Sequence, residues 1–383
     1  STLDADGGLF AALTPCFTTQ FARTTWTLRQ RDGSAVEVAL DIGHITVNDK
    51  TTPICELELE LLTGEPGALF AAAEKIAATI ATLPLGISKA QRGYALACDA
   101  VHAPQQARPP ALAPELPVAD AALRVLREAF SHCTANLNSL LHSDDPELVH
   151  QARIGWRRFK TSLKLFKKFT GSEAPAELRA LHPLLTALGA LRDLEVASQQ
   201  TLPMLANAYT DGDRMRQTHW RAMEHALTQA GDQHRDTVHA ALCDPGVGAA
   251  LLSTTRWLEI DLVQWAAEAV ADPKLPLQDW ARQQVKQWHS QLTKALAQAA
   301  QSPDNAHRAR ILAKRLRYGI EALHPLLPKR RAKHWHLEAS RLQADMGSAR
   351  DVLQALAIAT DLQVARGLLD FLRGYASASA RVA

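Results

Sequence analysis

Residues 150–160 read HQARIGWRRFK, and residues 307–317 read HRARILAKRLR. Each stretch has a histidine, an arginine three positions later, two adjacent cations seven and eight positions later, and a final cation. A second matching pair follows in the same order, LGALRD at residues 188–193 and MGSARD at residues 346–351. The two motifs recur after 157 and 158 positions, so we interpret them as an internal duplication.

The spacing predicts that the cations of each copy lie on one side of an α-helix. With about 100° of rotation per residue, the cations of the first copy fall within an arc of about 80°, opposite Phe159. The first stripe consists of His150, Arg153, Arg157, Lys160 and Lys164. The second stripe consists of His307, Arg310, Lys314 and Arg317. It is shorter because Glu321 stands where the first copy has Lys164.

A cationic stripe is either a solvated helix face or a surface that binds an anion. Solvated faces usually mix acidic with basic residues, because such pairs stabilise a helix and stacked like charges destabilise it. No acidic residue interrupts residues 148–172 or 305–320, and the arrangement occurs twice. We therefore favour an anionic ligand. Arginine suits phosphate because its planar guanidinium donates two parallel hydrogen bonds, while lysine adds a compact charge.

The Gly-x-x-Arg-Asp motifs leave two interpretations open. Arg192 and Arg350 could extend the basic surface, or each could pair with the following aspartate at the start of a helix, since a glycine precedes them.

Charge is distributed unevenly along the 383 residues. Residues 1–118 carry 8 Lys and Arg against 13 Asp and Glu, whereas residues 119–383 carry 34 against 27. The net charges are therefore −5 and +7. A basic second part indicates an anionic partner.

The cysteines, the apolar stretches and the first residues indicate the cellular compartment and whether the chain spans a membrane. Five scattered cysteines without a CxxC disfavour a disulfide framework or zinc ribbon, and are typical of a reducing, cytoplasmic compartment. No uncharged apolar stretch is long enough to predict a membrane span, and the first residues lack a signal-peptide pattern. Because Ser1 stands in place of Met, we expect processing or a fragment of a longer product.

The segment before the duplication combines predicted strands with one predicted helix and a linker. Between residues 20 and 62 polar and apolar residues alternate with a period of two, which predicts strands, with a hairpin turn at residues 31–34. Residues 67–82 have the pattern of one amphipathic helix. Five prolines lie between residues 103 and 118, so we predict an unpacked linker there.

From residue 119 onwards the pattern is helical, and helix packed on helix is the expected architecture. The strongest break is at residues 244–248, and further breaks stand at residues 171–175 and 272–273. We predict two helical bundles, at residues 119–243 and 249–383.

The duplicated motifs resemble those of the CHAD (conserved histidine α-helical domain) family, over about 265 residues. The resemblance implies two pseudo-symmetric antiparallel helical bundles, and basic residues that face a shared channel and bind inorganic polyphosphate. The residues that match, with the two motif arginines, are His150, Arg153, Arg157, Arg158, Lys160, Lys164, Arg192, His307, Arg310, Lys314, Arg315, Arg317 and Arg350.

Residues 1–102 are similar to the C-terminal half of a CYTH, or triphosphate tunnel, domain, a small α+β half barrel. The resemblance rests in part on Cys55-Glu56-Leu-Glu58-Leu-Glu60 and Ser88-Lys89-Ala-Gln-Arg92. In that family glutamates hold a divalent metal, and Lys and Arg hold the triphosphate. The strand with the ExExK motif is missing, so we treat Glu56, Glu58, Glu60, Lys89 and Arg92 as vestigial and expect neither metal nor triphosphatase activity.

The predicted function is binding of long-chain polyphosphate in the cytoplasm and at polyphosphate-rich bodies, without a cofactor, a catalytic residue or a membrane. Two alternatives stay open: a helical nucleic-acid-binding protein, and a fragment of an inorganic triphosphatase. A di-metal site at Glu147/His150 and Asp304/His307 is disfavoured, because each histidine begins a cationic stripe that repels metal. Asp144-Asp145-Pro146 and Asp304 are expected to be N-cap elements instead. His334 and His336 diverge on a helix and are expected at the surface. The tryptophans expected in the core or at a bundle interface are Trp156, Trp220, Trp257, Trp280, Trp288 and Trp335.

Overall fold

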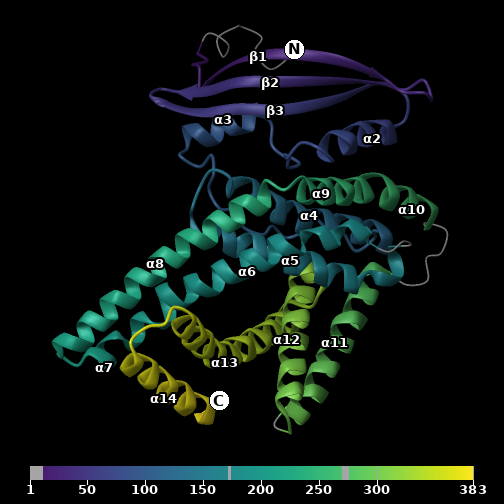
Figure 1. The fold of residues 1–383 in the computed structure, drawn as a ribbon. Helices are drawn as coiled ribbons and strands as arrows, with labels where there is room; N and C mark the ends of the chain where they lie inside the picture. Colours follow the sequence, from purple (N-terminus) through teal and green to yellow (C-terminus); the bar gives the residue numbers. More distant parts are fainter. Residues whose placement is uncertain (1–11, 171–173, 270–275, 300, 383) are drawn as a thin grey trace. The chain divides into compact units, whose positions relative to one another are not determined.

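The computed structural model describes residues 12–170, 174–269, 276–299 and 301–382, which form two units (Figure 1). The first unit is built from residues up to 80 and residues 84–103, and the second from residues 81–83 and from 104 onwards. The breaks expected at residues 272–273, and most of the one at 171–175, lie outside the described residues.

The first unit contains a three-stranded antiparallel sheet in the order β1 (Thr18–Arg29), β2 (Ala35–Val47), β3 (Lys50–Thr63). The turn after β1 was predicted, and Gly33 allows it by adopting a φ of 88°. The continuation of β2 to Val47 and the second tight turn were not predicted. Asn48 makes that turn with a φ of 51°, a conformation that asparagine tolerates better than most residues.

The alternation along β3 separates the two faces of the sheet. Leu57, Leu59 and Leu61 pack with the buried alanines of α2 (Pro66–Ala77). Glu56 and Glu58 point to the opposite face, where side chains of α3 (Lys89–Ala97) reach them. A capping box between Ser88 and Gln91 starts α3. The predicted helix at residues 67–82 ends at Ala77, and α3 was not predicted as a helix.

From Val118 onwards the second unit is mainly helical, as predicted. Its helices are α4 (Val118–Ser139), α5 (Pro146–Leu165), α6 (His182–Val196), α7 (Ala206–Thr210), α8 (Arg214–Leu242), α9 (Pro245–Arg256), α10 (Leu262–Ala269), α11 (Leu277–Ala299), α12 (Pro303–Leu323), α13 (Lys329–Asp361) and α14 (Arg366–Val382). None of the described helices is long and apolar enough to span a membrane.

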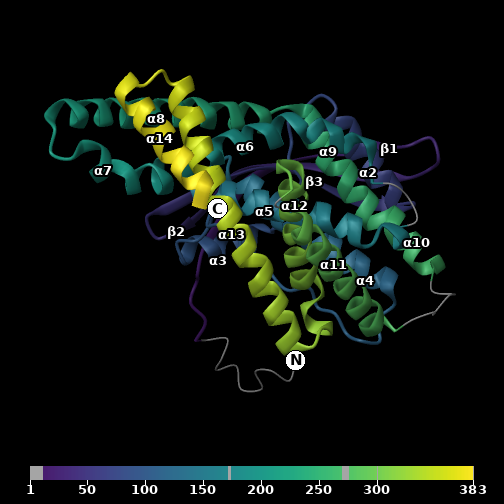
Figure 2. The ribbon, with the colours of Figure 1, turned by 90° about the horizontal axis from the view of Figure 1, so that it is seen from below.

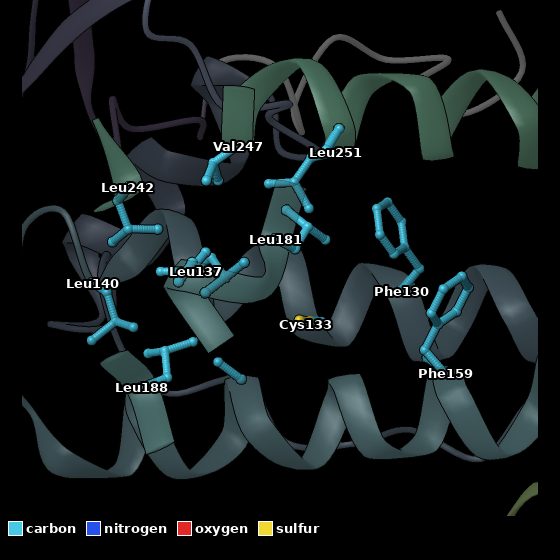
Figure 3. Packing of buried hydrophobic residues seen from close by; sticks show 14 of the residues in the cluster. Phe130, Cys133, Leu137, Leu140, Phe159, Leu181, Leu188, Leu242, Val247 and Leu251 are labelled. Atoms are coloured by element: carbon cyan, nitrogen blue, oxygen red, sulfur yellow. The ribbon is translucent and has the colours of Figure 1, made fainter. Parts of the chain in front are cut away.

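One core joins α4, α5 and α6 with the end of α8 and with α9 (Figure 3). Phe130 and Phe159 face each other between α4 and α5, with ring centroids 5.2 Å apart. The close approach of these helices depends on Gly155, because a Cβ there would lie 2.6 Å from the backbone nitrogen of Cys133. This core fixes the position of α5, which carries the first stripe.

The chain does not separate into two cores at residues 244–248. Val247, Leu251 and Leu258, which lie around the start of the predicted second bundle, pack in the core of α4–α6. A second cluster joins α11 and α12 with Phe166 and with α4 residues such as Val125, and a third joins α8 with α13 and α14. The helix that follows a strong turn can pack with the helices before the turn or with those after it. The turn alone does not specify which of the two cores its apolar residues join.

The proline-rich stretch is irregular, as predicted, but it packs. The Leu112 side chain is 8% exposed in the second cluster, and the backbone of Gln105 bonds to Asn136. The Arg158 guanidinium donates to the Arg108 carbonyl at 3.3 Å. The prolines prevent a helix here. The carbonyl groups of Gln105 and Arg108 instead accept hydrogen bonds from the side chains of Asn136 and Arg158.

Candidate functional site

The first stripe lies on α5, whose start is fixed by its cap. Asp145, as predicted, accepts a hydrogen bond from the Glu147 nitrogen at 2.8 Å, and Pro146 follows at the first helical position. Phe159 on the core side is fully buried, whereas Arg153 and Arg157 are half-buried and Lys160 and Lys164 exposed.

The second stripe lies on α12, where Ala313 and Leu316 are fully buried. The cap is Ser302, which accepts from the Asn305 nitrogen at 3.2 Å, and not Asp304 as expected. A proline at the first helical position follows Ser302 directly, so Asp304 already stands within the first turn. Arg310 and Lys314 are half-buried, and His307 at the start of the helix is exposed.

The two stripes converge. Helix α12 packs against both α5 and α13, and α13 packs against α6 (Figure 2). We name the cations that these four helices bring together the arginine–lysine cluster: Arg153, Arg157, Arg192, Arg310, Lys314 and Arg350. Residues almost 200 positions apart in the sequence therefore contribute to one positive surface.

Mutual repulsion in the cluster is visible in its pKa values. Burial first, and then Arg157, Arg310 and Arg350, lower the pKa of Lys314 to about 8. Burial and the nearby Arg157 lower the pKa of Arg153 to about 10, against a smaller opposing effect of Asp193. Burial also lowers the pKa of His150, with a further contribution from Arg192. A bound anion would stabilise the charged form of each of these groups.

Few acids compensate this charge. Among the described residues, Arg153, Arg157, Arg310, Lys314 and Arg350 have no carboxylate within ion-pair distance. Arg192 does have one, because Glu195 lies 3.3 Å away within α6. Asp193 and Asp351 lie near each other, and burial together with Asp193 raises the pKa of Asp351.

The glycine of the second motif does not start a helix. Gly189 lies inside α6 and Gly347 inside α13, so the alternative of a salt bridge at a helix start is wrong. Gly189 instead makes room for a neighbouring cation, since a Cβ there would lie 3.0 Å from a guanidinium nitrogen of Arg153. Sequence reasoning missed this role, because the neighbour belongs to another helix.

Three cations of the predicted binding set interact with groups outside the arginine–lysine cluster. Arg158 is 6% exposed, and its charge interacts with Glu321 and Glu128 rather than with the cluster. The Arg315 guanidinium lies over the Trp288 ring, 4.2 Å from its centroid. Arg317 pairs with Glu321 at 3.4 Å. In each copy the second of two adjacent cations lies about 100° around the helix from the first, so Arg158 and Arg315 point toward packed elements. We therefore assign them structural roles.

The first unit holds a separate charged group on its sheet. The Lys89 ammonium lies 2.5–2.6 Å from carboxylate oxygens of Asp41, Glu56 and Glu58. Arg23 donates to Asp41 at 2.7 Å, and Arg92 pairs with Glu56. Hydrogen bonds from Arg23 lower the pKa of the buried Asp41 to about 2. Burial alone would lower the pKa of Lys89, but its three carboxylate partners raise it above the usual value. Exposed Glu60 lies outside this group.

Three carboxylate oxygens within 4.8 Å of one another are suited to a divalent metal. Here, however, the Lys89 ammonium already occupies the position between them, and three cations balance the three acids. These residues therefore do not fit a metal ion unless Lys89 leaves. Elsewhere in the described chain no group of three or more carboxylate, histidine or cysteine side chains lies this close together.

The tryptophans follow the prediction. Trp220, Trp257, Trp280 and Trp288 are at most 6% exposed, and Trp156 and Trp335 are partly buried against the clusters. None of these rings is available beside the arginine–lysine cluster as a platform for a nucleobase.

Two family models match the chain. That of the CHAD domain matches residues 124–360, and that of the CYTH domain matches residues 1–94. The crystal structure of the CHAD domain from the plant Ricinus communis is similar with a TM-score of 0.61 and 26% sequence identity. The similarity covers 73% of this chain and 92% of that one.

A curated relative resembles a shorter part. The inorganic triphosphatase of Haemophilus influenzae is 38% identical over 86 residues, which are 22% of this chain. The chain spans about a quarter of the length of that relative, since the match covers 24% of it.

Proposed function

Because the chain belongs to the CHAD domain family, we propose that it binds long-chain inorganic polyphosphate through the arginine–lysine cluster. One observation carries the proposal: Arg157, Lys314 and Arg350 approach one another from three helices, with no carboxylate at ion-pair distance in the described chain. Such an arrangement destabilises the free protein, and a polyanion removes that cost when it binds.

The proposed ligand contacts combine the cluster with the ends of the stripes. Arg153, Arg157, Arg310 and Lys314 form the centre, because they are half-buried and repel one another. The outer contacts are His150, Lys160, Lys164, Arg192, His307, Arg317 and Arg350. The centre combines arginines, which bind phosphate oxygens in a bidentate manner, with a lysine that supplies a point charge. In this proposal two pseudo-symmetric bundles face a shared channel, which a linear chain can follow.

A nucleic acid would bind the same charges less well. Duplex recognition uses exposed cations on an accessible surface, whereas the central cations here are half-buried between helices. Single-stranded nucleic acids also need aromatic side chains on which bases stack, whereas Trp220, Trp257, Trp280 and Trp288 of the helical unit are buried in its cores. Polyphosphate has charge without bases, so it needs only the cations.

Direct titration tests the proposal. The full chain should bind long-chain polyphosphate far more tightly than duplex DNA of equal phosphate concentration or triphosphate, all at one fixed salt concentration. Isothermal titration calorimetry gives the three dissociation constants. Equal or tighter binding of the duplex would replace polyphosphate by nucleic acid as the ligand.

Affinity should also depend on pH through Lys314. Below its pKa of about 8 the free ammonium is charged and binding needs no proton. A bound polyanion raises this pKa toward or above the usual value, so at higher pH each binding event must take up a proton, and affinity falls as pH rises through 8. The groups that face Lys314 are Arg157, Arg310, Arg317 and Arg350, with Asp351 nearby.

The measurement is polyphosphate affinity between about pH 7 and about pH 9, a window below the pKa of about 10 of Arg153 and above the lowered pKa of His150. The matched variant is Lys314→Arg, which keeps the charge and should remove the fall. A fall of the same size in Lys314→Arg would assign the proton to another group.

A further inference from the structure

A second exposed basic group lies at the start of α13, outside the duplicated motifs. We name it the α13 patch: Lys329, Arg330, Arg331 and Lys333, all with exposed side chains. The first turn of α13 contains no acidic residue, and no side chain caps the helix. Cations at a helix N-terminus are unfavourable because the positive end of the helix dipole lies there, so the patch repels itself and the helix end.

The acids near the patch are already engaged. Glu321 lies 3.0 Å from His336 and 3.4 Å from Arg317, and Glu338 lies 3.3 Å from His289. Arg331 lies over the Trp335 ring, which in turn stacks on His289. None of the four patch cations has a carboxylate at ion-pair distance within the described residues. The patch therefore keeps its full charge toward solvent.

The α13 patch and Arg350 of the arginine–lysine cluster lie on the same helix. Lys329, His336, Gln343 and Arg350 follow one another at intervals of seven residues, about 20° short of two helical turns, so they lie along one side. At one end Arg350 contributes to the cluster beside Arg310. Between them His336 contacts Glu321, four residues after Arg317 on α12. The line from Lys329 to Arg350 spans about 31 Å.

From this placement we propose that the α13 patch is an outer binding site for the part of a long polyphosphate chain that extends beyond the cluster along α12 and α13. This inference rests on the proposed function. The chain has to pass Glu321, whose charge Arg317 offsets at 3.4 Å. A nucleic acid is less suited to the patch, because Trp335 already stacks on His289 and leaves no free ring for a base.

The test compares two variants of the full chain that lose the same charge. Lys329→Ala/Arg330→Ala/Arg331→Ala/Lys333→Ala removes the patch. Lys286→Ala/Lys294→Ala/Arg366→Ala/Arg373→Ala removes four exposed cations from α11 and α14. Long-chain polyphosphate and triphosphate are titrated into both and into the unchanged protein, over a range of salt concentrations, and circular dichroism checks the fold.

Loss of the patch should weaken long-chain binding by about 10-fold or more and flatten its salt dependence, because the contacts it supplies are intramolecular once the cluster is occupied. Triphosphate affinity should stay unchanged, and the control variant should resemble the unchanged protein. Equal losses for both ligands, or equal losses in both variants, would overturn the assignment. If the unchanged protein itself fails to bind long polyphosphate, the proposed function fails, which is a separate result.

Discussion

Arg153→Ala/Arg157→Ala should weaken binding of long-chain polyphosphate by about 100-fold or more, since each charged hydrogen bond contributes roughly 1.5–3 kcal/mol. Both guanidiniums are half-buried and lie next to Arg350 or Lys314, so their loss removes charge from the centre of the cluster. The logarithm of affinity should also fall less steeply with the logarithm of salt concentration, because fewer counterions are released.

The fold should survive this change. Neither side chain forms an ion pair with a carboxylate in the described chain, and both repel other cations, so their removal should not lower the melting temperature of the free protein. Arg179→Ala/Arg221→Ala, which removes two exposed arginines elsewhere, is the matched control. A salt dependence that stays as steep as in the control would place the ligand elsewhere on the protein.

The sequence predicted those features that depend on residues close together in the chain. A 3.6-residue period and the absence of acids predicted the two stripes, and they lie on α5 and α12. Alternation predicted the strands, although the residues around Gly43 and His44 broke the pattern and hid the end of β2. The cap at Asp145 was predicted because an N-cap depends on its immediate neighbours.

What the sequence did not reveal depends on contacts between distant residues. Gly189 gives room to Arg153, and Arg315 stacks on Trp288, and neither partner can be inferred from spacing along one helix. The same holds for Leu112, whose proline-rich neighbours suggested an unpacked linker, and for Leu251 in the core of α4–α6. The convergence of Arg157 with Lys314 is of this kind too. The resemblance implied it, whereas the spacing of the residues does not.

Because the two stripes converge, we expect the affinity for polyphosphate to depend strongly on the length of its chain. If both stripes contact one chain, the second contact is intramolecular and can raise affinity by orders of magnitude over either stripe alone. Triphosphate reaches only one stripe and gains nothing. Affinity should therefore climb with the number of phosphates and level off once a chain spans every contact it can reach.

Calorimetry over a series of defined chain lengths measures this dependence, with stoichiometry as a second readout. Arg153→Ala/Arg157→Ala and Arg310→Ala/Lys314→Ala each leave one stripe intact, so each should keep weak binding of short chains and lose most of the increase with length. The two variants need not be equal, because Arg317 in the second stripe is already paired with Glu321 at 3.4 Å, whereas Lys160 and Lys164 in the first are exposed and unpaired among the described residues. Loss of the first stripe should therefore cost more. An affinity per molecule that does not change with length, or two independent sites for one long chain, would mean that the stripes act as separate basic patches despite the repulsion between Arg157 and Lys314.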